Sequence, residues 1–281
     1  MPKSLSVNRG QLNHNHSFKP CHICFYRLVL LFLYFAPMQI LKNILGRLFA
    51  LWAILMFVLT LLLFVIPIGL SVLWQEPRRS WVAYFWYSRW MNTFLPLAGV
   101  RRTIKGRENF LKGQNFVVIC NHRSLLDPPV SSPAIPGPNK TIAKSEMAKI
   151  PIFGIVYKRG AVLVDRKSEE SRRASYGKMK EVLEQGLHMC IYPEGTRNKT
   201  KEPLQRFHDG AFRLAVDTKK AIIPALIFNT TDVMPRKPFF FWPVKRVQMH
   251  FLPAIAVEGK TAQQVKEEAF TTMKEYYLSH A

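Results

Sequence analysis

The sequence predicts an α/β domain, built on a mixed sheet with flanking helices, that follows an N-terminal membrane-embedded helical hairpin. Three observations support this prediction. Residues 48–74 contain no charged side chain, strand-like and helix-like segments alternate after residue 101, and most strand-like segments are continuous apolar runs. Strands that helices cover on both faces have such sequences, whereas a sheet with one wet face alternates apolar and polar residues.

Composition limits the class of protein and its partners. The chain has 281 residues, of which 48% are hydrophobic, and its four cysteines are too few for a disulfide scaffold. This apolar content excludes a disordered chain. The formal net charge of +22 indicates an anionic partner, which can be a membrane surface, a phosphorylated substrate or nucleic acid.

Residues 1–47 are expected to form a basic arm and a short apolar segment, 28–41, that is too short to span a bilayer. No small-residue cleavage site follows it, so we expect no signal peptide. Met38 is an alternative start to Met1, and the sequence leaves both open. The single C-x-x-C at residues 21–24 lacks the second pair of ligands that a zinc site needs, so we expect no metal there.

Residues 48–100 are expected to form membrane-associated helices. As a helix, residues 48–74 reach roughly 40 Å, which exceeds a hydrocarbon core of about 30 Å, although Pro67 can kink the helix into one leaflet. Residues 81–100 are rich in Trp and Tyr, which suits the headgroup level. Basic residues flank both ends of the long run, so a hairpin that enters and leaves by the cytoplasmic face is favoured over a single crossing.

Residues 101–281 are expected to form one soluble domain, long enough for a core of its own. The predicted strands are 116–120, 161–164, 187–192, 221–228 and 247–252, and the predicted helices are 168–185, 207–218 and 261–279. Two Pro-rich stretches, 131–140 and 230–243, are expected to be loops.

A candidate catalytic pair follows the first of these strands, in the segment 121–127 (NHRSLLD). His122 can act as a base, and Asp127 can orient its ring and stabilise the imidazolium that forms. The alternative is a helix capping box at Ser124 and Asp127, beside a loop histidine. Pro128 counts against it, because proline disfavours the helical conformation of the preceding residue.

A candidate binding loop follows the strand 187–192. Gly195 lets the backbone approach a ligand, Thr196 offers a hydroxyl, and the Arg197 guanidinium matches phosphate oxygens. Glu194 can hold Arg197 or bind a substrate hydroxyl. The alternative is an ordinary turn with a surface salt bridge.

Two weaker signals lie at the ends of other strands. The strand 161–164 leads into Asp165 and Arg166, near the strand ends that ligands of α/β proteins occupy, although a structural ion pair explains them as well. Pro224 interrupts an apolar strand, where proline often marks an edge or a bulge.

Taken in order, these stretches resemble the motifs of the PlsC-like lysophosphatidic acid acyltransferase family of glycerolipid acyltransferases. The family's N-H-x-x-x-x-D is matched by Asn121, His122 and Asp127. Its F-P-E-G-T-R-S is matched from Pro193 to Arg197, but with Tyr192 in place of Phe and Asn198 in place of Ser. Arg166 matches an arginine that follows a strand, and Pro224 matches an apolar-Pro motif. The resemblance covers residues 100–257 and implies a mostly parallel sheet.

The resemblance also implies a reaction. His122, oriented by Asp127, would deprotonate the sn-2 hydroxyl of 1-acyl-sn-glycerol 3-phosphate, which attacks the thioester of acyl-CoA or acyl carrier protein and gives phosphatidic acid. Arg166 and Arg197 would hold the phosphate, while Glu194, Gly195 and Thr196 shape the pocket. Direct transfer is preferred, because the sequence has no G-x-S-x-G elbow and neither strand cysteine is directly followed by a base.

The expected setting is the cytoplasmic face of a membrane, a bacterial inner membrane, with membrane lipids, lysophosphatidic acid and the acyl donor as partners and with no cofactor or metal. A related enzyme with another lysolipid acceptor, such as a lyso-aminolipid, stays open. A membrane-tethered protein that binds nucleic acid is the remaining alternative. No zinc finger, RNP element or helix-turn-helix pattern supports it, so nucleic acid is not an expected partner.

Overall fold

The structure is a computed structural model that describes residues 22–165, 167–236 and 239–280, with side chains from Met38 onward. The chain divides into two compact units, residues 1–44 and 45–281. The Cys-x-x-Cys side chains, the basic arm before residue 22 and Arg166 lie outside the described part. In the first unit the described residues form the beginning of helix α1 (His22–Leu70), which continues into the second unit.

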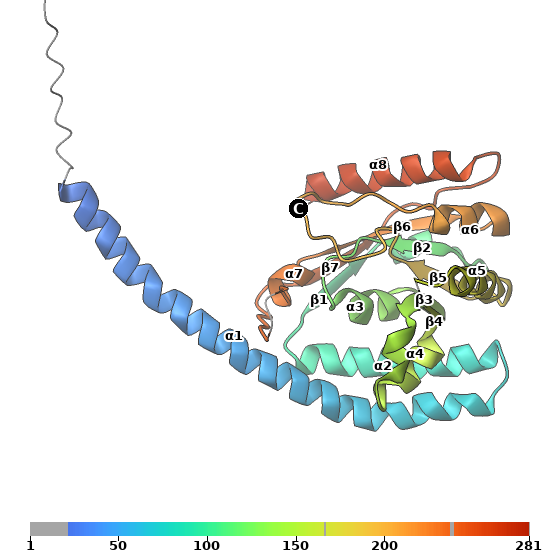
Figure 1. The fold of residues 1–281 in the computed structure, drawn as a ribbon, viewed down its shortest axis with the longest axis horizontal. Helices are drawn as coiled ribbons and strands as arrows, with labels where there is room; N and C mark the ends of the chain where they lie inside the picture. The colour runs from blue at the N-terminus through green and yellow to red at the C-terminus, as the bar shows by residue number, and fades with distance from the viewer. Residues whose placement is uncertain (1–21, 166, 237–238, 281) are drawn as a thin grey trace, which may run out of the picture. The chain divides into compact units, whose positions relative to one another are not determined.

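The second unit is built on a sheet that has seven strands within the described residues, in the order β1-β7-β6-β2-β5-β3-β4 (Figure 1). The strands are β1 (Arg102–Lys105), β2 (Val117–Cys120), β3 (Asn139–Lys144), β4 (Ala161–Val164), β5 (His188–Ile191), β6 (Ile222–Phe228) and β7 (Val247–Phe251). All neighbours pair in parallel except β6 and β7, which are antiparallel. The carboxyl ends of β2, β3, β4, β5 and β6 therefore lie at one edge, the usual site of ligands in α/β folds.

Helices cover both faces of the sheet, as the apolar strand sequences predict. On one face α5 (Glu169–Glu184), α6 (Gly210–Thr218) and α8 (Ala262–His280) pack over a core that includes Val117 and Ile119 of β2. On the other face the core includes Val118 and Cys120. The helices there are α2 (Arg78–Leu97), α3 (Asp127–Ala134), α4 (Phe153–Gly160) and the part of α1 from residue 45 onward. Successive strand residues point to opposite faces, so each strand contributes to both cores.

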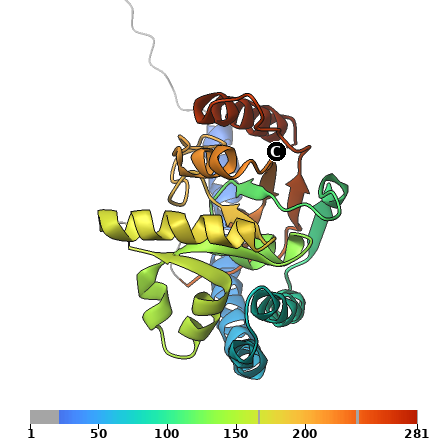
Figure 2. The same ribbon diagram turned by 90° about the vertical axis from the view of Figure 1, so that its right-hand side faces the viewer.

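Figure 2 shows these layers from the side, with α8 at the top and α2 beside α1 at the bottom. The short elements that complete the unit are α7 (Thr230–Val233), η1 (Ser71–Leu73), η2 (Arg107–Asn109) and η3 (Ser145–Lys149).

Helices α1 and α2 run antiparallel and pack closely. The indole Nε1 of Trp52 donates to the carbonyl of Leu97 at 2.8 Å, and that of Trp90 donates to Thr60 Oγ1 at 2.9 Å. Phe57 packs against Trp90 with ring centroids 5.3 Å apart. An ion pair of 3.3 Å between Glu76 and Lys140 ties the connection between the two helices to β3.

The outer side of α1 is apolar and exposed. Among the described residues, Met38–Leu73 is the one helical stretch long and apolar enough to cross a membrane, and 28% of its most apolar window is buried. Its exposed side chains include Leu48, Leu51, Ile54, Leu55, Leu59, Leu62, Leu63 and Ile66. An exposed apolar surface of this extent is typical of contact with lipid rather than with water.

Three sequence-based expectations are wrong in detail. The apolar runs 28–41 and 48–74 do not form separate segments, because α1 continues through Pro37 to Leu70. The stretch 131–140 is a loop only at 135–138, because its first residues form the end of α3 and its last residues the start of β3. Strands β1 and β3 and helix α4 lie outside every predicted element.

Two proline positions also correct the sequence reading. Asp127 begins α3 although Pro128 follows it, because the first helical turn needs no N–H donors and therefore tolerates proline. Pro224 does not mark an edge, because β6 lies between β7 and β2 inside the sheet and is buried throughout. Pro224 has no N–H to donate. It stands between Ile222, which forms a bridge with Ile255, and Ala225, where the pairing of β6 with β7 begins.

Candidate active site

His122 and Asp127 meet at the carboxyl end of β2. His122 lies two residues beyond the strand, and Asp127 is the first residue of α3. Nδ1 of the imidazole is 2.8 Å from Asp127 Oδ2, and the exposed fractions of the two side chains are 18% and 1%. The carboxylate is therefore sealed in the protein, while the histidine reaches the surface. This geometry is that of a base and its orienting acid.

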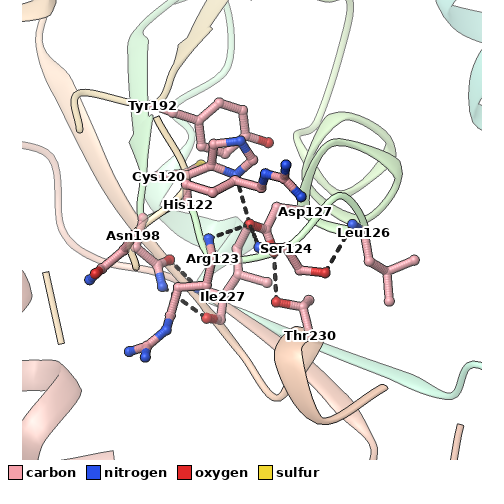
Figure 3. A network of polar contacts seen from close by, with 12 residues as sticks. Cys120, His122, Arg123, Ser124, Leu126, Asp127, Tyr192, Asn198, Ile227 and Thr230 are labelled. Carbon is pink, nitrogen blue, oxygen red and sulfur yellow. Dashed lines mark hydrogen bonds and ion pairs between the residues drawn. The ribbon is translucent and has the colours of Figure 1, made fainter. Parts of the chain in front are cut away.

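The Asp127 carboxylate is fixed by further donors (Figure 3). The backbone N–H groups of Arg123 and Ser124 donate to Oδ2 at 2.7 and 2.8 Å. The hydroxyl of Thr230, at the start of α7, donates to Oδ1 at 2.6 Å. A buried carboxylate that accepts this many hydrogen bonds keeps one orientation. With Asp127 as acceptor, Nδ1 of His122 carries the proton and Nε2 is left to accept one.

The backbone of His122 is held by the loop that follows β5. Its N–H donates to Glu194 Oε1 at 2.8 Å, and its carbonyl accepts from the N–H of Asn198 at 2.6 Å. Glu194 Oε2 accepts from the N–H of Gln205 at 3.0 Å. Burial raises the pKa of Glu194, against the hydrogen bonds and nearby charges that lower it. Both oxygens of Glu194 thus fasten the backbone of the site.

The same loop carries the other residues of the predicted binding motif. Gly195 has φ +67°, and a Cβ on it would lie 2.8 Å from Cδ2 of His208, so this turn requires glycine. Thr196 is exposed and Arg197 is half-buried. Within the part of the chain that the structure describes, the Arg197 guanidinium has no hydrogen bond or ion pair. Arg236 donates to the Arg197 carbonyl at 3.1 Å and also to that of Asn198, which fixes the main chain here.

The structure thus brings together His122, Asp127, Glu194, Gly195, Thr196 and Arg197. Arg166 lies outside the described residues. Its neighbour Asp165 follows β4, at the edge of the sheet, and accepts from the N–H of Lys167 at 2.9 Å. Pro224, in β6, lies beside Ile119 of β2.

Some contacts at the site had no signal in the sequence. Thr230 falls in a stretch expected to be a loop, 103 residues from Asp127. Tyr192 stacks on the imidazole of His122 with centroids 4.4 Å apart and an angle of 30° between the rings. Asn121 exchanges two hydrogen bonds with the backbone of Ile227, at 2.7 and 3.0 Å, and so joins the ends of β2 and β6. Long-range side-chain contacts of this kind leave no periodic trace in a sequence.

Two buried cysteines, in β2 and β5, precede the site residues but lack the exposure of a nucleophile. The Sγ atoms of Cys120 and Cys190 are 4.0 Å apart, and both side chains are buried. The hydrogen bond between them and burial raise the pKa of Cys120 well above its usual value. A thiol that stays protonated is a poor nucleophile, which favours direct attack by a substrate over a covalent intermediate.

Comparison with known proteins gives a consistent picture. Residues 101–228 match the protein family described as Acyltransferase. A 1-acyl-sn-glycerol-3-phosphate acyltransferase of Borreliella burgdorferi is 30% identical over 162 residues, covering 57% of this chain and 64% of that protein. The 1-acyl-sn-glycerol-3-phosphate acyltransferase alpha of Mus musculus is 31% identical over 171 residues, 60% of each chain. The chain thus spans about three-fifths of the length of these relatives.

The fold matches a solved structure as well. The crystal structure of the 1-acyl-sn-glycerophosphate acyltransferase PlsC from Thermotoga maritima superposes with a TM-score of 0.72, covering 84% of this chain and 96% of that chain. The sequences are 21% identical, so this likeness shows a shared fold.

Proposed function

We propose that the protein transfers an acyl chain from acyl-CoA or acyl carrier protein to the sn-2 hydroxyl of 1-acyl-sn-glycerol 3-phosphate, and the proposal starts from the match of residues 101–228 to the family described as Acyltransferase. The product is phosphatidic acid. The observation that carries the proposal is the 2.8 Å contact between a partly exposed His122 and a sealed, fully bonded Asp127. The relatives that share this part of the chain are named for the same reaction.

The proposed reaction is a single acyl transfer. Nε2 of His122 takes the proton of the sn-2 hydroxyl, whose oxygen attacks the thioester carbonyl. The tetrahedral intermediate then breaks its carbon–sulfur bond, and the thiolate that leaves recovers the proton from the imidazolium. Asp127 keeps its negative charge throughout and stabilises the imidazolium across the 2.8 Å hydrogen bond.

Arg197 is proposed to bind the phosphate of the acceptor. Its guanidinium is not bound to any described residue, and its neighbour Asn198 donates to the His122 carbonyl. The backbone of Arg197 is therefore next to a residue that is bonded to the base, and a guanidinium can bind two phosphate oxygens at once. Arg166 is proposed as a second phosphate ligand on the basis of its motif.

Glu194, Gly195 and Thr196 are proposed to shape the pocket. Glu194 fastens the His122 and Gln205 backbones, so its contribution is to hold the loop in place. The positive φ of Gly195 allows the turn, and the exposed Thr196 hydroxyl is free to meet the substrate.

The membrane arrangement is also a proposal. We divide the chain into an N-terminal segment (1–47), membrane-associated helices (48–100) and a catalytic domain (101–281). The antiparallel packing of α1 on α2 supports a hairpin that enters and leaves a membrane by the same face, which we propose to be the cytoplasmic face of a bacterial inner membrane. Such a site receives its lipid acceptor from the bilayer and its donor from water.

A panel of acceptors tests the function. Detergent-purified protein is offered acyl-CoA or acyl carrier protein together with lysophosphatidic acid, a lyso-aminolipid or a neutral monoacylglycerol, and thiol release is followed. Release that requires lysophosphatidic acid supports the proposal, and release that requires another lysolipid moves the acceptor to that class. Release without any acceptor, or no release with any of them, refutes acyl transfer. His122→Ala is the negative control and should lower turnover at least a thousandfold.

A further inference from the structure

The imidazole of His122 is held on one edge and on one face, and both contacts trace back to a single helix. Asp127, the first residue of α3, binds the edge through Nδ1 at 2.8 Å. Ser131, one turn further along α3, has its hydroxyl 2.8 Å from the phenolic oxygen of Tyr192. The ring of Tyr192 stacks on the face of the imidazole at 4.4 Å (Figure 3).

The edge contact alone does not fix the ring. A single hydrogen bond between one ring nitrogen and one carboxylate oxygen tolerates a range of angles, so the ring can still tilt through small changes of χ1 and χ2. The direction of Nε2 changes with that tilt, although proton transfer depends on it. A flat partner at 4.4 Å with an angle of 30° blocks the tilt on one side.

The tyrosine ring is itself held in place. Ser131 is 1% exposed, so its hydroxyl cannot turn to water, and the hydrogen bond with Tyr192 satisfies both groups. Burial, with the nearby Cys190, Cys120 and Asp127, raises the pKa of Tyr192 well above its ordinary value, against the hydrogen bond with Ser131. The phenol therefore stays neutral and does not compete with His122 as a base.

We propose that Tyr192 and Ser131 are positioning residues that set the ring plane of His122, so that one turn of α3 aligns both the edge and the face of the base. For its effect on turnover, this inference rests on the proposed acyl transfer. The proposal also assigns a role to the tyrosine that replaces the phenylalanine of the F-P-E-G-T-R-S motif. A phenylalanine at position 192 would keep the stacking on His122 but would have no hydroxyl to bind Ser131.

A direct test reads the ring of His122 without turnover. NMR spectra of the full-length protein in detergent, labelled at histidine, report the His122 ring signals, which are identified by their loss in His122→Ala. The variants are Tyr192→Phe, Ser131→Ala and Tyr84→Phe. Tyr84 is the matched control, because its phenol donates to the carbonyl of Ile135 at the other end of α3 at 2.6 Å.

We expect Tyr192→Phe and Ser131→Ala to shift or broaden the His122 ring signals, and Tyr84→Phe to leave them as they are. Turnover gives a second readout. Each of the first two variants should lower kcat about three- to tenfold, the range for the loss of one hydrogen bond, with KM for both substrates unchanged within twofold. The double variant should be no worse than the poorer single variant, because both remove the same contact.

The outcomes separate the two proposals. If Ser131→Ala leaves the His122 signals unchanged, or if kcat falls no further in Tyr192→Phe than in Tyr84→Phe, the positioning role is refuted. If the ring signals respond but the unaltered protein transfers no acyl group, positioning stands and the proposed function fails. Should Ser131→Ala unfold, Tyr192→Phe alone decides, because it keeps the ring and removes one oxygen.

Discussion

Replacing Asp127 by Asn tests the role of its charge while leaving its contacts possible. The asparagine Oδ1 can take the place of Oδ2 and accept from His122, Arg123 and Ser124. Its Nδ2 then faces Thr230 Oγ1, which lies 2.6 Å from Asp127 Oδ1, and a hydroxyl accepts as well as it donates. The fold and the orientation of His122 should survive, so the variant isolates the loss of one negative charge.

The size of the effect follows from the distance. Nδ1 and Oδ2 are 2.8 Å apart, which places the centres of the two charges about 4 Å apart. At an effective dielectric constant of about 20 the attraction is about 4 kcal/mol. His122 is 18% exposed, so water screens a part of it and about 2–4 kcal/mol is left. Because about 1.4 kcal/mol corresponds to a factor of ten, kcat should fall about 30- to 1,000-fold.

The assay is thiol release from acyl-CoA at saturating lysophosphatidic acid, with the thermal midpoint measured alongside. Thr230→Val is the matched variant: it removes the 2.6 Å hydrogen bond but keeps the charge, and kcat should fall less than tenfold. An Asp127→Asn protein that folds normally and keeps more than a tenth of its kcat would show that the carboxylate does not stabilise an imidazolium. An equal loss of kcat in both variants would show that Asp127 acts by orienting His122 and not through its charge.

Three further predictions concern the loop after β5 and the core. Arg197→Ala should raise KM at least tenfold for a phosphorylated acceptor and leave that for monoacylglycerol unchanged; equal changes for both acceptors would exclude the phosphate role. Gly195→Ala should lower the thermal midpoint, because a Cβ at φ +67° meets His208 at 2.8 Å, and adding His208→Ala should recover a part of the loss, whereas an unchanged midpoint would mean that the turn does not need glycine. Burial lowers the pKa of His188 to about 4, against its hydrogen bond to the Pro136 carbonyl. The unfolded chain therefore binds this proton below about pH 6.5 and the folded chain only below about pH 4, so stability should fall by about 3 kcal/mol as the pH drops between these values. Denaturant unfolding from pH 4 to 8 measures this loss, and His188→Asn should flatten that part of the profile.

The sequence predicted those parts of the fold in which composition and burial agree. The strands β2, β4, β5 and β6 were placed within about one residue, because strands covered on both faces are apolar runs with clear ends, and β7 was placed as closely from its alternation of apolar and polar residues. Strands β1 and β3 carry Lys, Arg, Thr and Asn and are mostly half-exposed, so no such run marks them. Helix α3 was missed because its prolines resemble a loop, although two of them lie in the first turn.

The candidate site was likewise predictable only in part. The local motifs supplied His122, Asp127 and the loop of Glu194, Gly195, Thr196 and Arg197, whose roles stay predictions. The residues that hold them in place are distant in sequence: Thr230 reaches Asp127 across 103 positions and Ser131 reaches Tyr192 across 61. Spacing within one segment carries no information on such contacts.

The hydrophobic core under the site is shared between α1, α2 and the sheet. Ala53, Leu61 and Ile68 of α1 belong to the same buried cluster as Phe94 of α2 and Val118 of β2. A fragment that starts at residue 101 would lose α1 and α2 and expose the part of this face that α3 and α4 do not cover, so we expect it to aggregate when expressed alone. Under the proposed function, the segment that contacts lipid and the site that transfers the acyl group share one core, so we expect no fragment of the chain to be both active and soluble in water.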